Sequence, residues 1–145
     1  MTVYLDTSFL IPIFVPEATS ERVEKYIRNL PAGSLCVSHW SRVEFASVLA
    51  RDVRIGLLDE AAASSVVERF ELFLAASFDV LPLRIEDCEL ARNYVLRFST
   101  GLRAGDAMHL AIAANAGVKS LLTLDRGMLK AGKLLKLPVS AGIRI

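Results

Sequence analysis

The stretch GLRAGDAMHLAIAANAGVKSLLTLD, residues 101–125, predicts a buried helix followed at once by a buried strand. Residues 107–116 are apolar on almost every side of a helix, which is typical of a helix covered on several faces. The run SLLTLD is continuously apolar until it ends in an acid, which favours a strand inside a sheet. A carboxylate, Asp106, thus stands at the start of a buried helix. Either a helix cap or an acidic site would explain it.

The rest of the chain alternates the same two patterns. Further strands are expected at residues 3–5, 34–38, 79–83 and 137–142. Further helices are expected from about Ser8, over 20–30, over 41–54, from the cap Asp59 to about residue 77, over 85–98 and over 126–134. Short apolar strands without a polar face are typical of a parallel sheet covered by helices on both sides. The sequence therefore predicts an α/β fold with a mostly parallel sheet.

The composition is that of a compact globule. The chain has 145 residues, of which 53% are hydrophobic, and we expect one domain over 1–145 without linker or repeat. Its net charge of +1 excludes a bulk attraction to nucleic acid or membrane, so such a partner would need a local patch. The N-terminal apolar segment is interrupted by Asp6 and Pro12 and is too short to span a bilayer. We expect a cytoplasmic protein in which Cys36 and Cys88 are reduced core residues, with a disulfide as the less favoured alternative.

Four carboxylates are expected at one edge of the sheet. Asp6 directly follows the strand expected at residues 3–5, and Asp125 directly follows the apolar run SLLTL, residues 120–124. Glu44 lies in the first turn of the helix expected after the strand at 34–38. Asp106 begins the helix that leads into the strand SLLTL. Parallel strands end at one edge, and the helix leading into a strand begins there, so all four acids share a rim. The order of the strands, which decides whether they converge, cannot be read from these patterns.

Each acid also has a purely structural interpretation. Asp6 and Asp125 could cap the helices that follow them, and Asp106 stands where an N-cap is expected. The segment SRVE matches a capping box in which Glu44 reaches back to the amide of Ser41. Capping and ligand binding are compatible, because one carboxylate can hold a helix end and face a ligand. Four unrelated caps at one rim is the less favoured explanation.

A group of carboxylates at one rim favours a bound cation. Two unit charges about 5–6 Å apart repel by roughly 3 kcal/mol at an effective dielectric constant near 20. A divalent cation removes this conflict, and oxygen ligands without paired Cys or His favour Mg²⁺ or Mn²⁺ over Zn²⁺. Such an ion can activate water for attack on a phosphate. Whether one ion or two would bind is left open.

These segments resemble the PIN-domain nucleases, and within them the VapC-type toxins of prokaryotic toxin–antitoxin pairs. YLDTSFL, SRVEFASVLAR, RAGDAMHLAIA and LLTLDRGM are similar to the four motifs of the family, in order and over nearly the whole chain. The resemblance implies that the metal-binding and catalytic acids are Asp6, Glu44, Asp106 and Asp125. It further implies that Ser8 and Thr123 are supporting hydroxyl groups.

The resemblance also implies a fold and partners. The fold would be a three-layer sandwich with a central, mostly parallel sheet of about five strands. The activity would be Mg²⁺- or Mn²⁺-dependent cleavage of RNA by a homodimer, inhibited by a small antitoxin that places a basic group in the acidic pocket. Two alternatives remain open: an RNA-processing PIN nuclease without antitoxin, and a non-catalytic interaction module. A phosphatase of the haloacid dehalogenase type is disfavoured, because Ser8 stands where such enzymes carry a second Asp.

Several other side chains lie close to these motifs. Arg103, Lys130 and Lys133 are candidates for contact with RNA or antitoxin, with a solvated surface as the alternative. His109, one turn after Asp106, is interpreted as a buried packing or hydrogen-bonding side chain rather than a general base. Trp40 has no assigned role.

Overall fold

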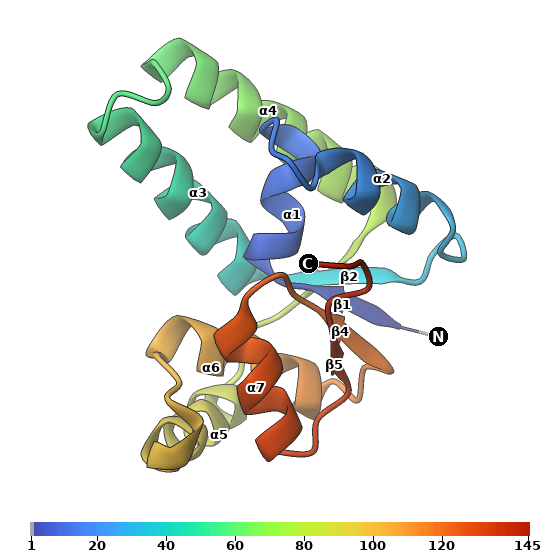
Figure 1. Ribbon diagram of the computed structural model, residues 1–145, viewed down its shortest axis with the longest axis vertical. Coiled ribbons are helices and arrows are strands. Elements are labelled where there is room, and N and C mark those ends of the chain that lie inside the picture. The colour runs from blue at the N-terminus through green and yellow to red at the C-terminus, as the bar shows by residue number, and fades with distance from the viewer. Residues whose placement is uncertain (1) are drawn as a thin grey trace.

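The computed structural model describes residues 2–145, and its centre is a five-stranded sheet (Figure 1). The strands are β1 Val3–Leu5, β2 Leu35–Ser38, β3 Asp79–Leu81, β4 Ser120–Leu122 and β5 Val139–Ser140. They lie in the order β3-β2-β1-β4-β5, and each pair of neighbours is parallel. The prediction of a parallel sheet of about five strands is confirmed.

Within residues 2–145 the connections between strands form seven α-helices and one 3-10 helix. They are α1 Thr7–Phe14, α2 Ser20–Arg28, α3 His39–Arg54, α4 Glu60–Ser77, α5 Ile85–Leu96, the 3-10 helix η1 Phe98–Thr100, α6 Ala104–Asn115 and α7 Arg126–Leu134. The predicted cap of α4 is confirmed, since the Asp59 carboxylate accepts a hydrogen bond from the backbone N–H of Ala62 at 2.7 Å. In this part of the chain every helix is too short or too polar to serve as a membrane span.

Helices cover both faces of the sheet (Figure 1). Side chains alternate along a strand, so Val3 and Leu5 pack against α1 to α4, whereas Tyr4 packs on the side of α5 to α7. The first core contains a stacked pair, Phe45 of α3 and Phe70 of α4, with ring centroids 3.8 Å apart. The predicted three-layer arrangement is confirmed.

Two predicted helix caps are wrong, and both concern the acids. Helix α3 begins at His39, and its capping box joins Ser38 to Ser41, so Glu44 is one turn too late to take part. Helix α6 begins at Ala104 after the N-cap residue Arg103, so Asp106 lies inside the first turn. Neither carboxylate is therefore explained by capping.

The prediction for the cysteines is half right. Both Cys36 and Cys88 are free, and Cys36 is buried in the sheet. Cys88 is exposed, because it lies on the outer side of α5, away from the buried residues Asp87 and Ala91.

Candidate active site

The strand order brings the acidic segments together. Strands β2, β1 and β4 are neighbours, and Asp6, at the end of β1, lies between the segments that carry Glu44 and Asp125. The first turn of α6 places Asp106 at the same edge. All four carboxylates line one open cavity of about 630 Å³. The convergence that the pattern of strands and helices left undecided is therefore present in the fold.

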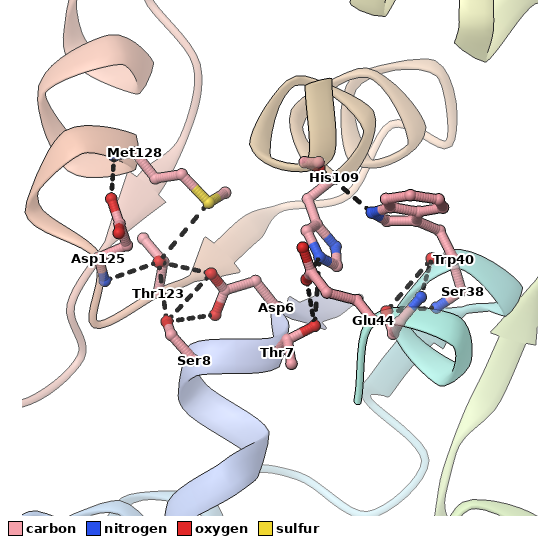
Figure 2. A network of polar contacts seen from close by, with 12 residues as sticks. Asp6, Thr7, Ser8, Ser38, Trp40, Glu44, His109, Thr123, Asp125 and Met128 are labelled. Carbon is pink, nitrogen blue, oxygen red and sulfur yellow. Dashed lines mark hydrogen bonds and ion pairs between the residues drawn. The ribbon is translucent and has the colours of Figure 1, made fainter. Parts of the chain in front are cut away.

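Asp6 is fixed by hydrogen bonds from two side chains, Ser8 and Thr123 (Figure 2), and from the backbone of Phe9. Its Oδ1 accepts the backbone N–H of Phe9 at 3.0 Å, which caps α1, and the hydroxyl of Ser8 at 2.8 Å. Its Oδ2 accepts the hydroxyl of Thr123 at 2.7 Å. Burial raises the pKa of Asp6, and these hydrogen bonds oppose the rise. Asp6 is thus both a helix cap and a wall of the cavity.

Ser8 and Thr123 also attach the loop after β4 to the end of β1. The hydroxyl of Ser8 accepts the backbone N–H of Leu124 at 2.9 Å, and that of Thr123 accepts the N–H of Asp125 at 3.0 Å. The carboxylate of Asp125 in turn caps α7 by accepting the N–H of Met128 at 2.8 Å. The two hydroxyl groups lie between Asp6 and Asp125 in Figure 2 and fix their relative positions.

Glu44 is held by different donors on the other side of the cavity (Figure 2). Its Oε2 accepts hydrogen bonds from the hydroxyl of Thr7 and from Nε2 of His109, the latter at 2.6 Å. Burial by itself would raise the pKa of Glu44, but the hydrogen bonds from His109 and Thr7 bring it below its ordinary value. Glu44 is therefore ionised at neutral pH. His109 is fully buried and hydrogen-bonded, as its sequence context indicated.

Asp106 shows the electrostatic cost of this arrangement. Burial, together with the negative charges of Asp125 and Glu44, raises the pKa of Asp106 to about 6. Gly105 beside it allows the close approach of α6 and α3, because a Cβ atom there would lie 2.8 Å from Oε1 of Glu44. The indole N–H of Trp40 donates to the carbonyl of Gly105 at 3.2 Å, which gives Trp40 a packing role next to the site.

The donor set fits a hard divalent cation. Within residues 2–145 no three Asp, Glu, His or Cys side chains are already gathered tightly enough to hold a metal ion, so binding would require the carboxylates to move inward. The lining nevertheless includes five carboxylate side chains, the four acids named above and Glu17, and carboxylate oxygens are the ligands that Mg²⁺ and Mn²⁺ prefer. Burial contributes most to the raised pKa of Asp106, and the negative charges of Asp125 and Glu44, which a cation would neutralise, raise it further.

Several residues of the site were not singled out by sequence reasoning. Thr7 stands between Asp6 and Ser8 in the first motif, and that position was a usable signal for a third side chain of the site. Tyr4 was another, because a tyrosine inside a buried strand needs a partner for its hydroxyl. Gly105 carried no signal until α3 and α6 were placed together.

The basic side chains of the cavity differ from those expected. Arg22 and Arg51 are the basic side chains that line it. Arg103, Lys130 and Lys133 are exposed and do not belong to the lining. Contact of these three residues with RNA or antitoxin stays a prediction.

Comparison with known proteins gives the same picture of the fold. A family model described as PIN domain matches residues 3–134. Ribonuclease VapC3 of Pyrobaculum aerophilum is 32% identical over 127 residues, which make up 87% of this chain and 91% of the relative. The crystal structure of VapC20 of Mycobacterium tuberculosis, described as a sarcin-ricin loop cleaving toxin, has a TM-score of 0.73 at 18% identity, covering 90% of this chain and 95% of that one. A toxin–antitoxin complex from Klebsiella pneumoniae has a TM-score of 0.69 at 18% identity, covering 99% of this chain and 100% of that one.

Proposed function

Because this chain belongs to the PIN-domain family, we propose that it is a metal-dependent endoribonuclease and the toxin of a toxin–antitoxin pair. The observation that carries the proposal is the cavity lined jointly by Asp6, Glu44, Asp106 and Asp125. The relative VapC3, which is named a ribonuclease and matches over most of both chains, supports RNA as the substrate. A non-catalytic module is less well supported, because it would have no need for four acids in one cavity.

In this proposal the four acids hold Mg²⁺ or Mn²⁺. A bound divalent ion lowers the pKa of water and offsets negative charge on a phosphate, which is the chemistry that phosphodiester hydrolysis needs. The chain itself supplies positioning. Ser8 and Thr123 fix Asp6 through the hydrogen bonds described above, and Thr7 fixes Glu44. Asp6 and Asp125 also cap the N-termini of α1 and α7, which holds both carboxylates at the edge of the cavity.

RNA reaches an acidic cavity only if cations at its edge offset the repulsion of the phosphates. Arg22 and Arg51 are the basic side chains of the lining, and their guanidinium groups can contact RNA phosphates beside the acids. Arg103, Lys130 and Lys133 would extend this contact to RNA or antitoxin further from the cavity.

The proposed partners are a small antitoxin and a second copy of the chain. An antitoxin that places a basic group among the four acids would occupy the metal site, and the likeness to a toxin–antitoxin complex supports this assembly.

The proposed homodimer is supported by large apolar side chains that are exposed on α5 and η1, with Phe98 83% and Ile85 77% exposed. Light scattering after size exclusion tests the dimer. The proposed location is the cytoplasm, where the tRNA, rRNA and mRNA substrates are found.

RNA cleavage by the purified, antitoxin-free chain tests the proposal. We expect cleavage of pooled tRNA, rRNA or mRNA with Mg²⁺ or Mn²⁺ and none with a chelator. Asp6→Asn and Asp106→Asn should abolish it, whereas Asp79→Asn, an exposed carboxylate on β3 outside the cavity, should not. Equal cleavage by wild type and both site variants would reject the assignment.

A separate observation distinguishes a toxin from an RNA-processing nuclease. A small reading frame next to this gene, whose product binds the chain and blocks cleavage, would establish the toxin. Cleavage that no neighbouring gene product inhibits would favour RNA processing.

A further inference from the structure

A buried chain of hydrogen bonds lies behind Glu44, outside the acidic cavity. The hydroxyl of Tyr4 is 2.8 Å from Nδ1 of His109, whose Nε2 is 2.6 Å from Oε2 of Glu44. The side of Tyr4 away from His109 is also occupied, with Oγ of Ser38 at 2.8 Å and Oγ of Ser41 at 3.2 Å. Tyr4 and His109 are both completely buried. The chain therefore joins the capping box of α3 to the carboxylate of Glu44 through β1 and α6.

The direction of these hydrogen bonds follows from their chemistry. The ionised carboxylate of Glu44 can only accept, so Nε2 of His109 carries the hydrogen. When the ring is neutral, Nδ1 accepts and the hydroxyl of Tyr4 donates to it, whereas in the imidazolium form Nδ1 donates to the oxygen of Tyr4. The hydroxyl groups of Ser38 and Ser41 can each donate to or accept from that oxygen. In both forms of the ring Nε2 donates to Glu44, and neighbouring hydrogen bonds polarise one another in a low-dielectric interior.

This geometry selects one oxygen of Glu44. Both hydrogen bonds to its carboxylate, from His109 and from Thr7, end on Oε2. Oε1 is the oxygen directed toward Gly105, in the first turn of the helix that carries Asp106. A glutamate has several rotatable bonds, and two donors on one oxygen remove most of that freedom. Neither of these hydrogen bonds occupies Oε1, so this oxygen is available to a ligand in the cavity that Glu44 lines.

A role of His109 as a general base does not fit. The side chain is fully buried, so water in the cavity does not reach it. Both ring nitrogens already have partners, Tyr4 at Nδ1 and Glu44 at Nε2. His109 can therefore act only through Glu44.

We propose that His109 and Tyr4 are positioning residues that orient Glu44 so that its Oε1 faces a divalent cation. This inference rests on the proposed function, since it needs the cation. Metal-binding side chains are commonly oriented by such outer partners, whose loss lowers metal affinity by roughly 10- to 100-fold.

The test measures Mn²⁺ binding without RNA, by calorimetry and by the rise of the melting temperature with Mn²⁺ concentration. Tyr4→Phe removes one hydroxyl and keeps the ring, and His109→Leu removes the donor to Glu44. His109→Gln keeps an amide donor near Nε2. Tyr94→Phe removes the hydroxyl of a half-buried tyrosine on α5, outside the chain of hydrogen bonds, and is the matched control.

We expect the Kd for Mn²⁺ to rise about 10-fold or more in His109→Leu and several-fold in Tyr4→Phe. His109→Gln should recover part of the loss, and Tyr94→Phe should match wild type. In RNA cleavage the Mn²⁺ concentration for half-maximal rate should rise in parallel, with the KM for RNA unchanged. A role in folding alone would lower the melting temperature without this change in Mn²⁺ affinity.

A double-mutant cycle with Glu44→Gln makes the test independent of folding. Tyr4→Phe should weaken Mn²⁺ binding in wild type and have no further effect in the Glu44→Gln background. The positioning role alone would be overturned if Tyr4→Phe weakened Mn²⁺ binding equally in both backgrounds. It would also be overturned if Tyr4→Phe and folded His109→Leu both bound Mn²⁺ with a Kd within two-fold of wild type. Failure of wild type itself to bind Mn²⁺ would overturn the proposed function, and the positioning role with it.

Discussion

Replacement of Asp106 by Asn should stabilise the metal-free protein at neutral pH. Burial and the charges of Asp125 and Glu44 raise the pKa of Asp106 from 3.8 to about 6, so the folded state disfavours its ionised form. Between these two pH values the unfolded chain releases the proton first, and the free energy of unfolding therefore falls as pH rises through this window. An Asn side chain has no proton to release, so the free energy of unfolding of the variant does not fall in this way.

The expected magnitude follows from the same shift. A rise of the pKa from 3.8 to about 6 corresponds to ~3 kcal/mol at ~1.4 kcal/mol for each tenfold change in the ionisation constant. Asp106 is only half-buried and faces an open cavity, so solvent screening lowers the expected gain to ~1–2 kcal/mol. The difference from wild type should shrink as pH falls toward the unfolded-state pKa of 3.8 and approach zero below it, because the carboxyl is then protonated in both states.

Guanidinium unfolding with a chelator present, from about pH 4 to about pH 8, measures the effect. Circular dichroism and the fluorescence of Trp40, the single tryptophan of the chain, give two probes of one transition. Asp79→Asn changes the same functional group at an exposed position of β3 and should show no comparable gain. Addition of Mn²⁺ should stabilise wild type far more than Asp106→Asn, because the variant lacks a ligand.

One result would refute this account of the cavity. If Asp106→Asn and wild type have the same free energy of unfolding at about pH 8, Asp106 is not under strain from neighbouring negative charge. The electrostatic argument for a cation would then lose its main support, whatever the variant does to RNA cleavage.

Three further substitutions test the local geometry. Gly105→Ala should reduce RNA cleavage by displacing Glu44, because the new Cβ would lie 2.8 Å from its Oε1, whereas helix propensity should add up to ~1 kcal/mol of stability. A cleavage assay and a thermal melt measure the two effects separately, and unchanged cleavage would contradict the close approach of α6 and Glu44. Asp59→Ala should lower the free energy of unfolding by ~1 kcal/mol through loss of the α4 cap, and should leave cleavage per folded molecule unchanged. Phe70→Ala should lower the free energy of unfolding by ~3–5 kcal/mol, because Phe70 is 1% exposed and stacked on Phe45. A loss below ~1 kcal/mol in chemical denaturation would exclude a central role for this pair in the core.

The sequence was sufficient for most of the elements and for placing the four acids at one edge of the sheet. The short apolar run 3–5 favours a buried strand, and the segment before SLLTLD, apolar on almost every side, favours a buried helix; the structure places β1, α6 and β4 there. Residues that come directly after strands, such as Asp6, are assigned to the sheet edge by chain direction alone. The two wrong caps at Ser41 and Asp106 reflect helix starts that lie two or three residues earlier than the apolar pattern indicates.

Only the tertiary structure decided that the acids meet and what holds them. The order β3-β2-β1-β4-β5 makes β2, β1 and β4 neighbours, and strand order depends on contacts between segments far apart in the chain, which no local pattern records. The same is true of His109, whose partners Tyr4 and Glu44 are 105 and 65 residues away in sequence. Periodicity reports which face of an element is buried, whereas the partner buried against that face is set by packing of the whole chain.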